Sequence, residues 1–331
     1  MVDTITLRFP PLPLRLGIIN DHTRPGPTRA LNWYYKPKEP TVFNDVVQKK
    51  ACLLFNGEGG RHIRLFLTNQ FADGFNTSLP NLLFGRTGSI LTSQDELDRS
   101  MESVFGEIGR VCEIPDGLDY DLTRVDLCLQ FRVPGLPAQA FFASLRSARH
   151  PLIHSSAEEW TVRSHRSGIN FKGADMMVKL YDKGLELLRT PSDIVRIEIQ
   201  LRGQALKTRL GEGGQFPRAL QFDHFYQVYR DLLLRFPTVR HLPLDSCRTA
   251  RQILPFLIAA CENSNFTLPD GRRAMELFEQ SQMGIQSLRD LRNEVVSTQL
   301  EMNNISFEEL LPPQWPPPHL VPRIIEEGTN G

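Results

Sequence analysis

Three short segments of the chain place a reactive side chain in the middle of an alternating apolar and polar pattern. The segments are 123–131, 177–183 and 195–202. Because side chains alternate across a β-strand, each segment is expected to bury one face and to present polar groups on the other. The central polar groups are Asp126, Tyr181 and Glu198, which are two carboxylates and one phenol.

Tyr181 stands between Lys179 and Lys183 on the polar face of its segment. A phenol titrates near a pKa of about 10, and two neighbouring cations are expected to favour the phenolate and to lower that pKa. A tyrosine in this position can attack phosphorus while the lysines hold phosphate oxygens. The alternative, equally open at this point, is an aromatic residue on an edge strand between two edge-protecting lysines.

Asp126 and Glu198 each stand in mid-strand, where an acidic residue is disfavoured. Their oxygens are hard ligands that suit Mg²⁺ or Mn²⁺, and such an ion would stabilise charge on a phosphate. If the three strands lie side by side, both acids and Tyr181 should converge on one open sheet face, with carboxylate oxygens within about 5 Å of each other. The alternatives are a solvated face at Asp126 and a surface ion-pair face at Glu198.

The elements that must position these residues follow from periodicity. Strands are expected at 4–9 and 63–68 as well as at the three segments above, and helices at 94–110, 137–149 and 204–210. Ser93 and Glu96 form a capping-box pattern before the first of these helices. From about residue 215 the apolar residues step by three and four, which predicts a helical part.

This pattern predicts an α+β fold, with a mainly antiparallel sheet and covering helices followed by a helical C-terminal part. The expected domains are a sheet-containing domain at 1–212, a helical domain at 213–310 and a flexible tail at 311–331. Six prolines between Leu311 and Pro322 exclude a helix or a central strand there.

Five segments in order resemble the replication initiators of filamentous phages, the gene II/gene X protein family. They are 1–10, 78–85, 123–126, 178–186 and 195–202. The resemblance covers roughly the first 211 residues and implies an HUH-like endonuclease fold. It also implies site-specific nicking at a rolling-circle replication origin through a 5′-phosphotyrosyl intermediate, followed by religation.

Carried over by position, the resemblance makes Tyr181 the nucleophile and Asp126 and Glu198 the metal-site carboxylates. Lys183 would assist at the phosphate or metal. Seven further basic residues are expected to bind DNA: Lys179, Arg124, Arg163, Arg166, Lys172, Arg196 and Arg202.

The chain departs from this superfamily at the metal site. None of its eight histidines forms a His-apolar-His triplet, and Gly85-Arg86-Thr87 stands where family members have Gly-His-Asn. His165 is the candidate third ligand, with a phosphate contact or a plain surface position as the alternative.

Composition sets the remaining bounds. The formal net charge is zero, but 141–210 carries twelve lysines and arginines against seven acids, so the middle third is the basic part. An odd count of five cysteines without CxxC spacing predicts neither a disulfide framework nor a zinc site, and favours a reducing cytoplasm. The resemblance to phage proteins implies that this is the cytoplasm of a bacterial host. No run of apolar residues reaches the roughly 20 that a membrane helix needs.

The expected partner is supercoiled or single-stranded DNA at a replication origin. The helical C-terminal part is expected to contact duplex DNA, a host helicase or a second copy of the chain, and the sequence does not choose among them. Two other functions stay open: a non-catalytic DNA-binding protein of the same fold, and a relaxase or transposase with the same chemistry.

Overall fold

A computed structural model describes most of the N-terminal two thirds of the chain and one C-terminal segment. The described residues are 1–19, 22–30, 32–43, 46–57, 61–85, 88–132, 138, 153, 158–162, 165–188, 192–210, 221–235 and 307–324. They divide into two compact units: unit 1 contains 1–128, 199–229 and 322–325, and unit 2 contains 129–198, 230–321 and 326–331.

Unit 1 is built on a sheet with the strand order β13-β9-β1-β8-β7-β6-β3-β2. Every pairing with a defined register in it is antiparallel. The strands first met here are β1 Val2–Pro13, β2 Gly26–Pro27, β3 Trp33–Pro37, β6 Lys50–Gly57, β7 Arg61–Thr68, β8 Phe71–Ser78 and β9 Asp121–Arg132, with a separate pair β4 Thr41–Phe43 and β5 Val46–Gln48. Strands β9 and β13 (Ile194–Arg202) each continue from one unit into the other.

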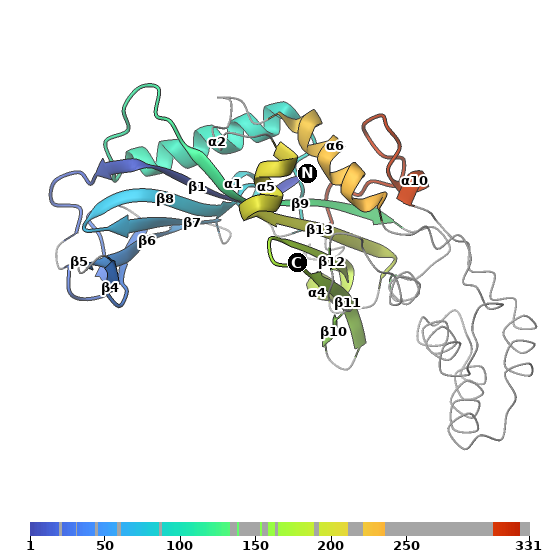
Figure 1. Ribbon diagram of the computed structural model, residues 1–331, viewed down its shortest axis with the longest axis horizontal. Helices are drawn as coiled ribbons and strands as arrows, with labels where there is room; N and C mark the ends of the chain where they lie inside the picture. Colours follow the sequence, from blue (N-terminus) through green and yellow to red (C-terminus); the bar gives the residue numbers. More distant parts are fainter. Residues whose placement is uncertain are drawn as a thin grey trace, which may run out of the picture. The chain divides into compact units, whose positions relative to one another are not determined.

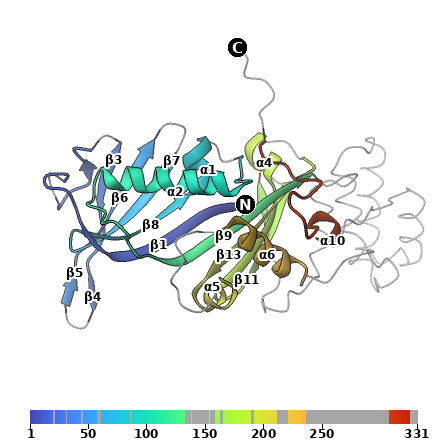
Figure 2. The same ribbon diagram turned by 90° about the horizontal axis from the view of Figure 1, so that it is seen from above.

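Two helices lie on one face of the β1, β7 and β8 part of this sheet (Figure 1, Figure 2). They are α1 Leu79–Phe84 and α2 Gln94–Gly109. The rings of Phe105 on α2 and Phe75 on β8 meet edge to face, with centroids 5.9 Å apart. The face of the sheet that carries Phe75 and Leu65 is therefore the buried face, and the opposite face bears the polar residues.

The start of α2 follows from the capping residues. The Ser93 hydroxyl accepts a hydrogen bond from the Glu96 amide, as the capping-box pattern predicted. The Glu96 carboxylate, however, accepts from the Thr92 amide and hydroxyl, at 2.6 and 2.9 Å. The box therefore closes one residue further toward the N-terminus than the sequence pattern indicated.

Unit 2 contains the strand order β10-β11-β12-β13-β9. Its own strands are β10 Glu158–Val162, β11 His165–Lys172 and β12 Met176–Asp182, and the short helix α4 Lys183–Leu188 follows β12 directly. β11 pairs with both neighbours in antiparallel register. Val178 and Leu180 are fully buried, as the alternation of that segment predicted.

Three further helices are α5 Gly203–Leu210, α6 Phe222–Leu233 and α10 Phe307–Leu310. The expected apolar stripe of α6 is buried, since Phe222, Phe225, Tyr226, Tyr229 and Leu233 are all at most 3% exposed. Within the described part of the chain, no helix is long and apolar enough to cross a membrane.

The expected α+β class, with a mainly antiparallel sheet and covering helices, is confirmed. All five expected strands and the expected helices at 94–110 and 204–210 are present within one or two residues at most ends, although β1 and β7 extend further. The expected helix at 137–149 and most of the helical part at 213–310 fall outside the described residues. In the division into two compact units, 199–229 belongs to unit 1, and the expected domain boundary at 212 stays a prediction.

The proline-rich segment differs from the flexible tail that its composition predicted. The Val321 amide donates to the Gln130 carbonyl at 2.8 Å, and the Gln130 side chain donates to the Val321 carbonyl at 3.0 Å. In unit 1 the Ile324 amide donates to the Gly88 carbonyl at 3.1 Å. Prolines exclude a helix but leave these other backbone groups free to pair, so the described part of the segment is held in place.

Candidate active site

Tyr181 and Glu198 form the central contact of unit 2. Tyr181 lies on β12 and Glu198 on β13, and the phenol donates a hydrogen bond of 2.5 Å to Oε1 of the carboxylate. This length is typical of a hydrogen bond between a hydroxyl and an ionised acceptor. Both residues belong to unit 2. The sequence predicted that these two strands bring a phenol and an acid together, and the hydrogen bond between them agrees with this.

Two cations also lie beside the Glu198 carboxylate, one at each oxygen. Arg196 Nε lies 3.1 Å from Oε1, and Lys179 Nζ lies 3.5 Å from Oε2. The Arg196 side chain is only 2% exposed, and its guanidinium also reaches the Gln130 amide oxygen at 3.5 Å. Burial alone would raise the pKa of Glu198, but Arg196, the Tyr181 hydroxyl and Lys179 together bring it below its ordinary value.

The pKa of Tyr181 corrects a prediction made from the sequence. Burial raises it well above its ordinary value, and the neighbouring Glu198 and Glu186 add to this shift against the opposing effect of Arg196. The flanking lysines were expected to lower it, but Arg196 is the cation that acts against the shift. Desolvation outweighs Arg196 because it penalises the phenolate directly, so Tyr181 is a neutral hydrogen-bond donor to a carboxylate.

Lys183 begins α4 and does not continue the strand. Its ammonium lies 5.5 Å from the centre of the Tyr181 ring and 2.9 Å from the Glu186 carboxylate. Burial and the nearby Arg196 charge lower the pKa of Lys183. The lysine that was expected to assist at the phosphate therefore lies beside the aromatic ring of the proposed nucleophile.

Asp182 fixes the end of β12, directly after Tyr181. It accepts hydrogen bonds from the Leu185 and Ser192 amides, both at 2.8 Å, and from the Ser192 hydroxyl at 2.6 Å. Gly184 lies against the same serine, since a Cβ there would stand 2.3 Å from Ser192 Oγ. This set of contacts, here called the Asp182 lock, holds the chain that carries Tyr181 in place.

Asp126 occupies a different environment in unit 1. Its carboxylate accepts two hydrogen bonds from Arg124, at 2.8 and 2.5 Å, and one from the Gln200 amide at 3.1 Å. Burial raises the pKa of Asp126 despite these donors, and the nearby Asp3 charge raises it further. The side chain is buried, so it does not stand on a solvent-open sheet face as expected.

The other expected DNA-binding residues are spread over different positions. Lys172 and Arg202 are exposed, whereas Arg196 is buried beside Glu198 and Arg124 is paired with Asp126. Arg163 and the side chains of His165 and Arg166 lie outside the described residues.

A divalent cation would need more oxygen ligands than either acid provides alone. Within the described ranges, no group of three or more histidine, cysteine or acidic side chains is close enough to hold a metal ion. Asp126 belongs to unit 1 and Glu198 to unit 2, and their sharing of one ion stays a prediction. In unit 1 the nearby Asp3 and Asp126 carry hard oxygen atoms, which accept hydrogen bonds from Arg124, Gln200, Thr4 and Ser78. In unit 2 both Glu198 oxygens have donors or cations beside them as well.

Two residues close to the candidate site residues were not singled out from the sequence. Asp3 follows Val2 at the start of an alternating strand, and nothing in its spacing links it to Asp126. Asn170 lies opposite Lys179 in the β11–β12 register, and its amide oxygen is buried without a hydrogen-bond partner in the described part of the chain. For Asn170, the only signal in the sequence was a polar residue within the segment 168–172.

The chain was compared with known protein families, curated proteins and solved structures. No protein-family model and no curated protein matches the chain, so membership in the filamentous-phage family stays a prediction. Among solved structures, the chain is similar to a rolling circle replication initiator protein from Geobacillus stearothermophilus. The two are 11% identical with a TM-score of 0.38, over 76% of this chain and 89% of the other.

Proposed function

We propose that this protein nicks one DNA strand by covalent attack of Tyr181 on a phosphodiester and later rejoins it, as an initiator of rolling-circle replication. The observation that supports the chemistry is the 2.5 Å hydrogen bond from the phenol to Glu198. A nucleophilic hydroxyl next to a base, which is itself oriented by further groups, is the arrangement that activates weak nucleophiles.

The attack uses side chains of unit 2. Tyr181 Oη forms a bond to phosphorus while its proton passes to Glu198 Oε1, and the bond from phosphorus to the 3′-oxygen breaks. The 3′-oxygen leaves as a hydroxyl after it takes a proton from solvent. The 5′-phosphate remains on the tyrosine, and the reverse reaction with a 3′-hydroxyl rejoins the strand.

The low pKa of Glu198 and the high pKa of Tyr181 make this proton transfer uphill in the structure as it stands. An incoming phosphate would change that balance, because it competes with Glu198 for Lys179, whose side chain is 30% exposed. With this cation turned to the phosphate, the carboxylate becomes a stronger base, and Lys179 stabilises the charge that develops on phosphorus. Positioning and electrostatics are the main contributions to phosphoryl transfer.

Dependence on Mg²⁺ or Mn²⁺ is a further part of the proposal. The two acids of unit 1, Asp3 and Asp126, are the hard oxygen donors that suit such an ion, which would neutralise phosphate charge when bound. The ligand set of neither unit is complete in the described residues, so the attack above is written with side chains alone.

The decisive experiment is a covalent-adduct assay. The wild-type chain is incubated with supercoiled DNA that carries the cognate origin, with Mg²⁺, and protein-linked nicked product is separated on a denaturing gel. Replacement Tyr181→Phe should abolish the adduct, whereas Tyr34→Phe, at an exposed tyrosine of unit 1, should leave it unchanged. Chelation by EDTA should remove activity, and added Mg²⁺ or Mn²⁺ should restore it.

An adduct that persists in Tyr181→Phe would reject the nucleophile assignment. Tight DNA binding by the wild type without any nick would instead favour a non-catalytic DNA-binding protein. Nicking at a conjugative or transposon end, but not at a replication origin, would favour a relaxase or transposase.

A further inference from the structure

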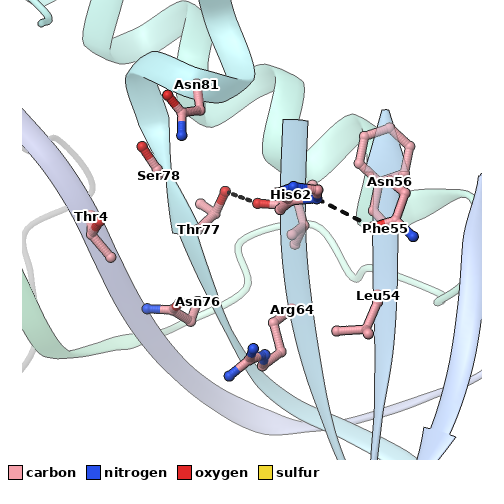
Figure 3. Close-up of a pocket in the computed structure, with 11 residues that line it drawn as sticks. Thr4, Leu54, Phe55, Asn56, His62, Arg64, Asn76, Thr77, Ser78 and Asn81 are labelled. Carbon is pink, nitrogen blue, oxygen red and sulfur yellow. Dashed lines mark hydrogen bonds between the residues drawn. The ribbon is translucent and has the colours of Figure 1, made fainter. Parts of the chain in front are cut away.

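A cavity of about 360 Å³ lies in unit 1, on strands β1, β6, β7 and β8 and the start of α1 (Figure 3). This volume is at the lower end of the range of about 300–1,000 Å³ for small-ligand pockets. It is lined by Thr4, Leu54, Phe55, Asn56, His62, Ile63, Arg64, Asn76, Thr77, Ser78 and Asn81. The proposed chemistry at Tyr181 in unit 2 uses none of these residues.

Arg64 supplies the positive charge of the cavity. It is exposed, and it lies opposite Leu54 on one side and Asn76 on the other in the strand register. Within the described ranges its guanidinium makes no hydrogen bond or ion pair, and no acidic residue lines the cavity. Asp3 does accept hydrogen bonds from the lining hydroxyls of Thr4 and Ser78, so the cationic character is strongest at the Arg64 side.

Three asparagines give the cavity both donors and acceptors. Asn76 uses its amide nitrogen on Ile5 and Thr6, which fixes the side chain and leaves its oxygen free of described partners. Asn56 contacts His62 at 3.2 Å, and the Asn81 side chain has no described partner. Asparagine amides and arginine are the groups that pair with base edges and phosphates.

The polar face continues beyond the cavity into an aromatic and basic contact. Phe66 lies two residues after Arg64 on β7 and therefore on the same face. The Arg8 guanidinium is 4.8 Å, and the Lys38 ammonium 5.9 Å, from the centre of its ring. Aromatic rings next to cations are what proteins use to follow a single strand, since every base has a stacking face.

We infer that this cavity binds one nucleotide of a single DNA strand, with Arg64 on the phosphate and the asparagines on the base, and that the strand continues over Phe66. The inference rests on the proposed function only in taking DNA as the substrate. It adds a site in unit 1 that holds the strand independently of Tyr181. A cavity of about 360 Å³ has the size of a small-ligand pocket, as expected for a single nucleotide and not for a duplex.

The test is fluorescence anisotropy with a labelled single-stranded oligonucleotide and the full chain, in EDTA so that no cleavage occurs. Arg64→Ala should raise Kd at least fivefold and reduce the slope of log Kd against log salt by about one. The matched control is Arg99→Ala, which removes an exposed α2 arginine of unit 1 that pairs only with Asp95 among the described contacts. It should change Kd less than twofold.

A second variant, Asn81→Leu, removes an amide and adds apolar bulk without changing charge. It should weaken binding to an intact oligonucleotide. The wild type should bind an oligonucleotide with one abasic position more weakly than the intact one, and in Asn81→Leu this difference should disappear. Both variants should unfold at the wild-type temperature, since the two residues are exposed or half-buried.

Unchanged single-strand affinity in Arg64→Ala, or tighter binding of duplex than of single strands by the wild type, would overturn the inference. Wild type that binds no single strand would overturn it as well. If Arg64→Ala weakens binding but the wild type forms no Tyr181 adduct, the strand site stands and the nicking proposal fails. If the adduct forms and Arg64→Ala binds normally, only the strand site fails.

Discussion

The same short motif, an arginine, an apolar residue and an acid, occurs once in each unit and has opposite electrostatic results. In unit 1 Arg124 pairs with Asp126, and the pKa of the acid is raised. In unit 2 Arg196 pairs with Glu198, and the pKa of the acid is lowered. Both acids are removed from water, so burial alone does not explain the difference.

The difference lies in the partners of each pair. Arg124 is 37% exposed and Asp126 has no second cation among its described contacts, while a like charge, Asp3, is close. Arg196 is 2% exposed, and Lys179 and the Tyr181 hydroxyl act on Glu198 from other sides. One motif can thus give a carboxylate whose pKa is raised or one whose pKa is lowered, and the surrounding strands decide which.

The largest effect, and the largest difference between the two units, is expected when the charge of each acid is removed in turn. Glu198→Gln should lower the free energy of unfolding by about 3 kcal/mol, because it leaves the buried Arg196 charge without its counter-ion. Asp126→Asn should change it by no more than about 1 kcal/mol, since Arg124 can turn to solvent. Urea unfolding of both variants measures this, and equal losses would contradict the comparison.

The next effect concerns the arginines. Arg196→Met should lower the free energy of unfolding by about 2 kcal/mol, since Glu198 keeps Lys179 and Tyr181 but the Gln130 oxygen loses a donor. Arg124→Met should cost about half as much or less. Thermal unfolding of the two proteins at matched concentration gives the ranking, and a reversed order would show that Arg124 is the more important cation.

The Asp182 lock predicts an effect of about 1–3 kcal/mol on unfolding at Gly184, because the Cβ of Gly184→Ala would overlap Ser192. The control is Gly106→Ala in α2 of unit 1, where a Cβ meets nothing within 4 Å. That change should stabilise the protein by about 0.5–1 kcal/mol, as alanine favours a helix interior. A stable Gly184→Ala protein with wild-type nicking would mean that the lock does not position Tyr181.

The smallest effect is expected at Gln200. Replacement Gln200→Leu removes the amide that donates to Asp126 and should cost about 1 kcal/mol. It should leave the hydrogen bond between Tyr181 and Glu198 intact, so covalent adduct formation per folded molecule should drop less than in Glu198→Gln. An equal loss of adduct in both variants would mean that the two acids act as one unit.

The sequence predicted the strands of both sites because alternation over seven to nine residues is a strong signal. It identified β9, β12 and β13 and placed Asp126, Tyr181 and Glu198 on their polar faces. It did not predict α1, which is six residues long, or β3, which precedes a proline-rich stretch. Segments this short contain too few positions for a period to show.

The electrostatics could not be predicted in the same way. The pKa of Tyr181 depends on burial and on an acid 17 residues away, and the alternation of a strand does not reveal how deeply its polar face is covered. Likewise, Asp3 lies near Asp126 only because β1 pairs with β9. Local pattern gives the face of a residue, whereas its charge state depends on neighbours from distant parts of the chain.

The pairing of Gln130 with Val321 has a consequence for how the protein is made. These two residues are 191 apart in the chain, and they bond through both backbone and side chain. During translation, β9 is complete long before residue 321 leaves the ribosome exit tunnel. The end of that strand therefore stays unpaired on one side until the last part of the chain has been made. Chain closures over such separations are slow and entropically costly. A stalled or truncated nascent chain would therefore carry an exposed strand end, which is a site where chaperones would be expected to bind.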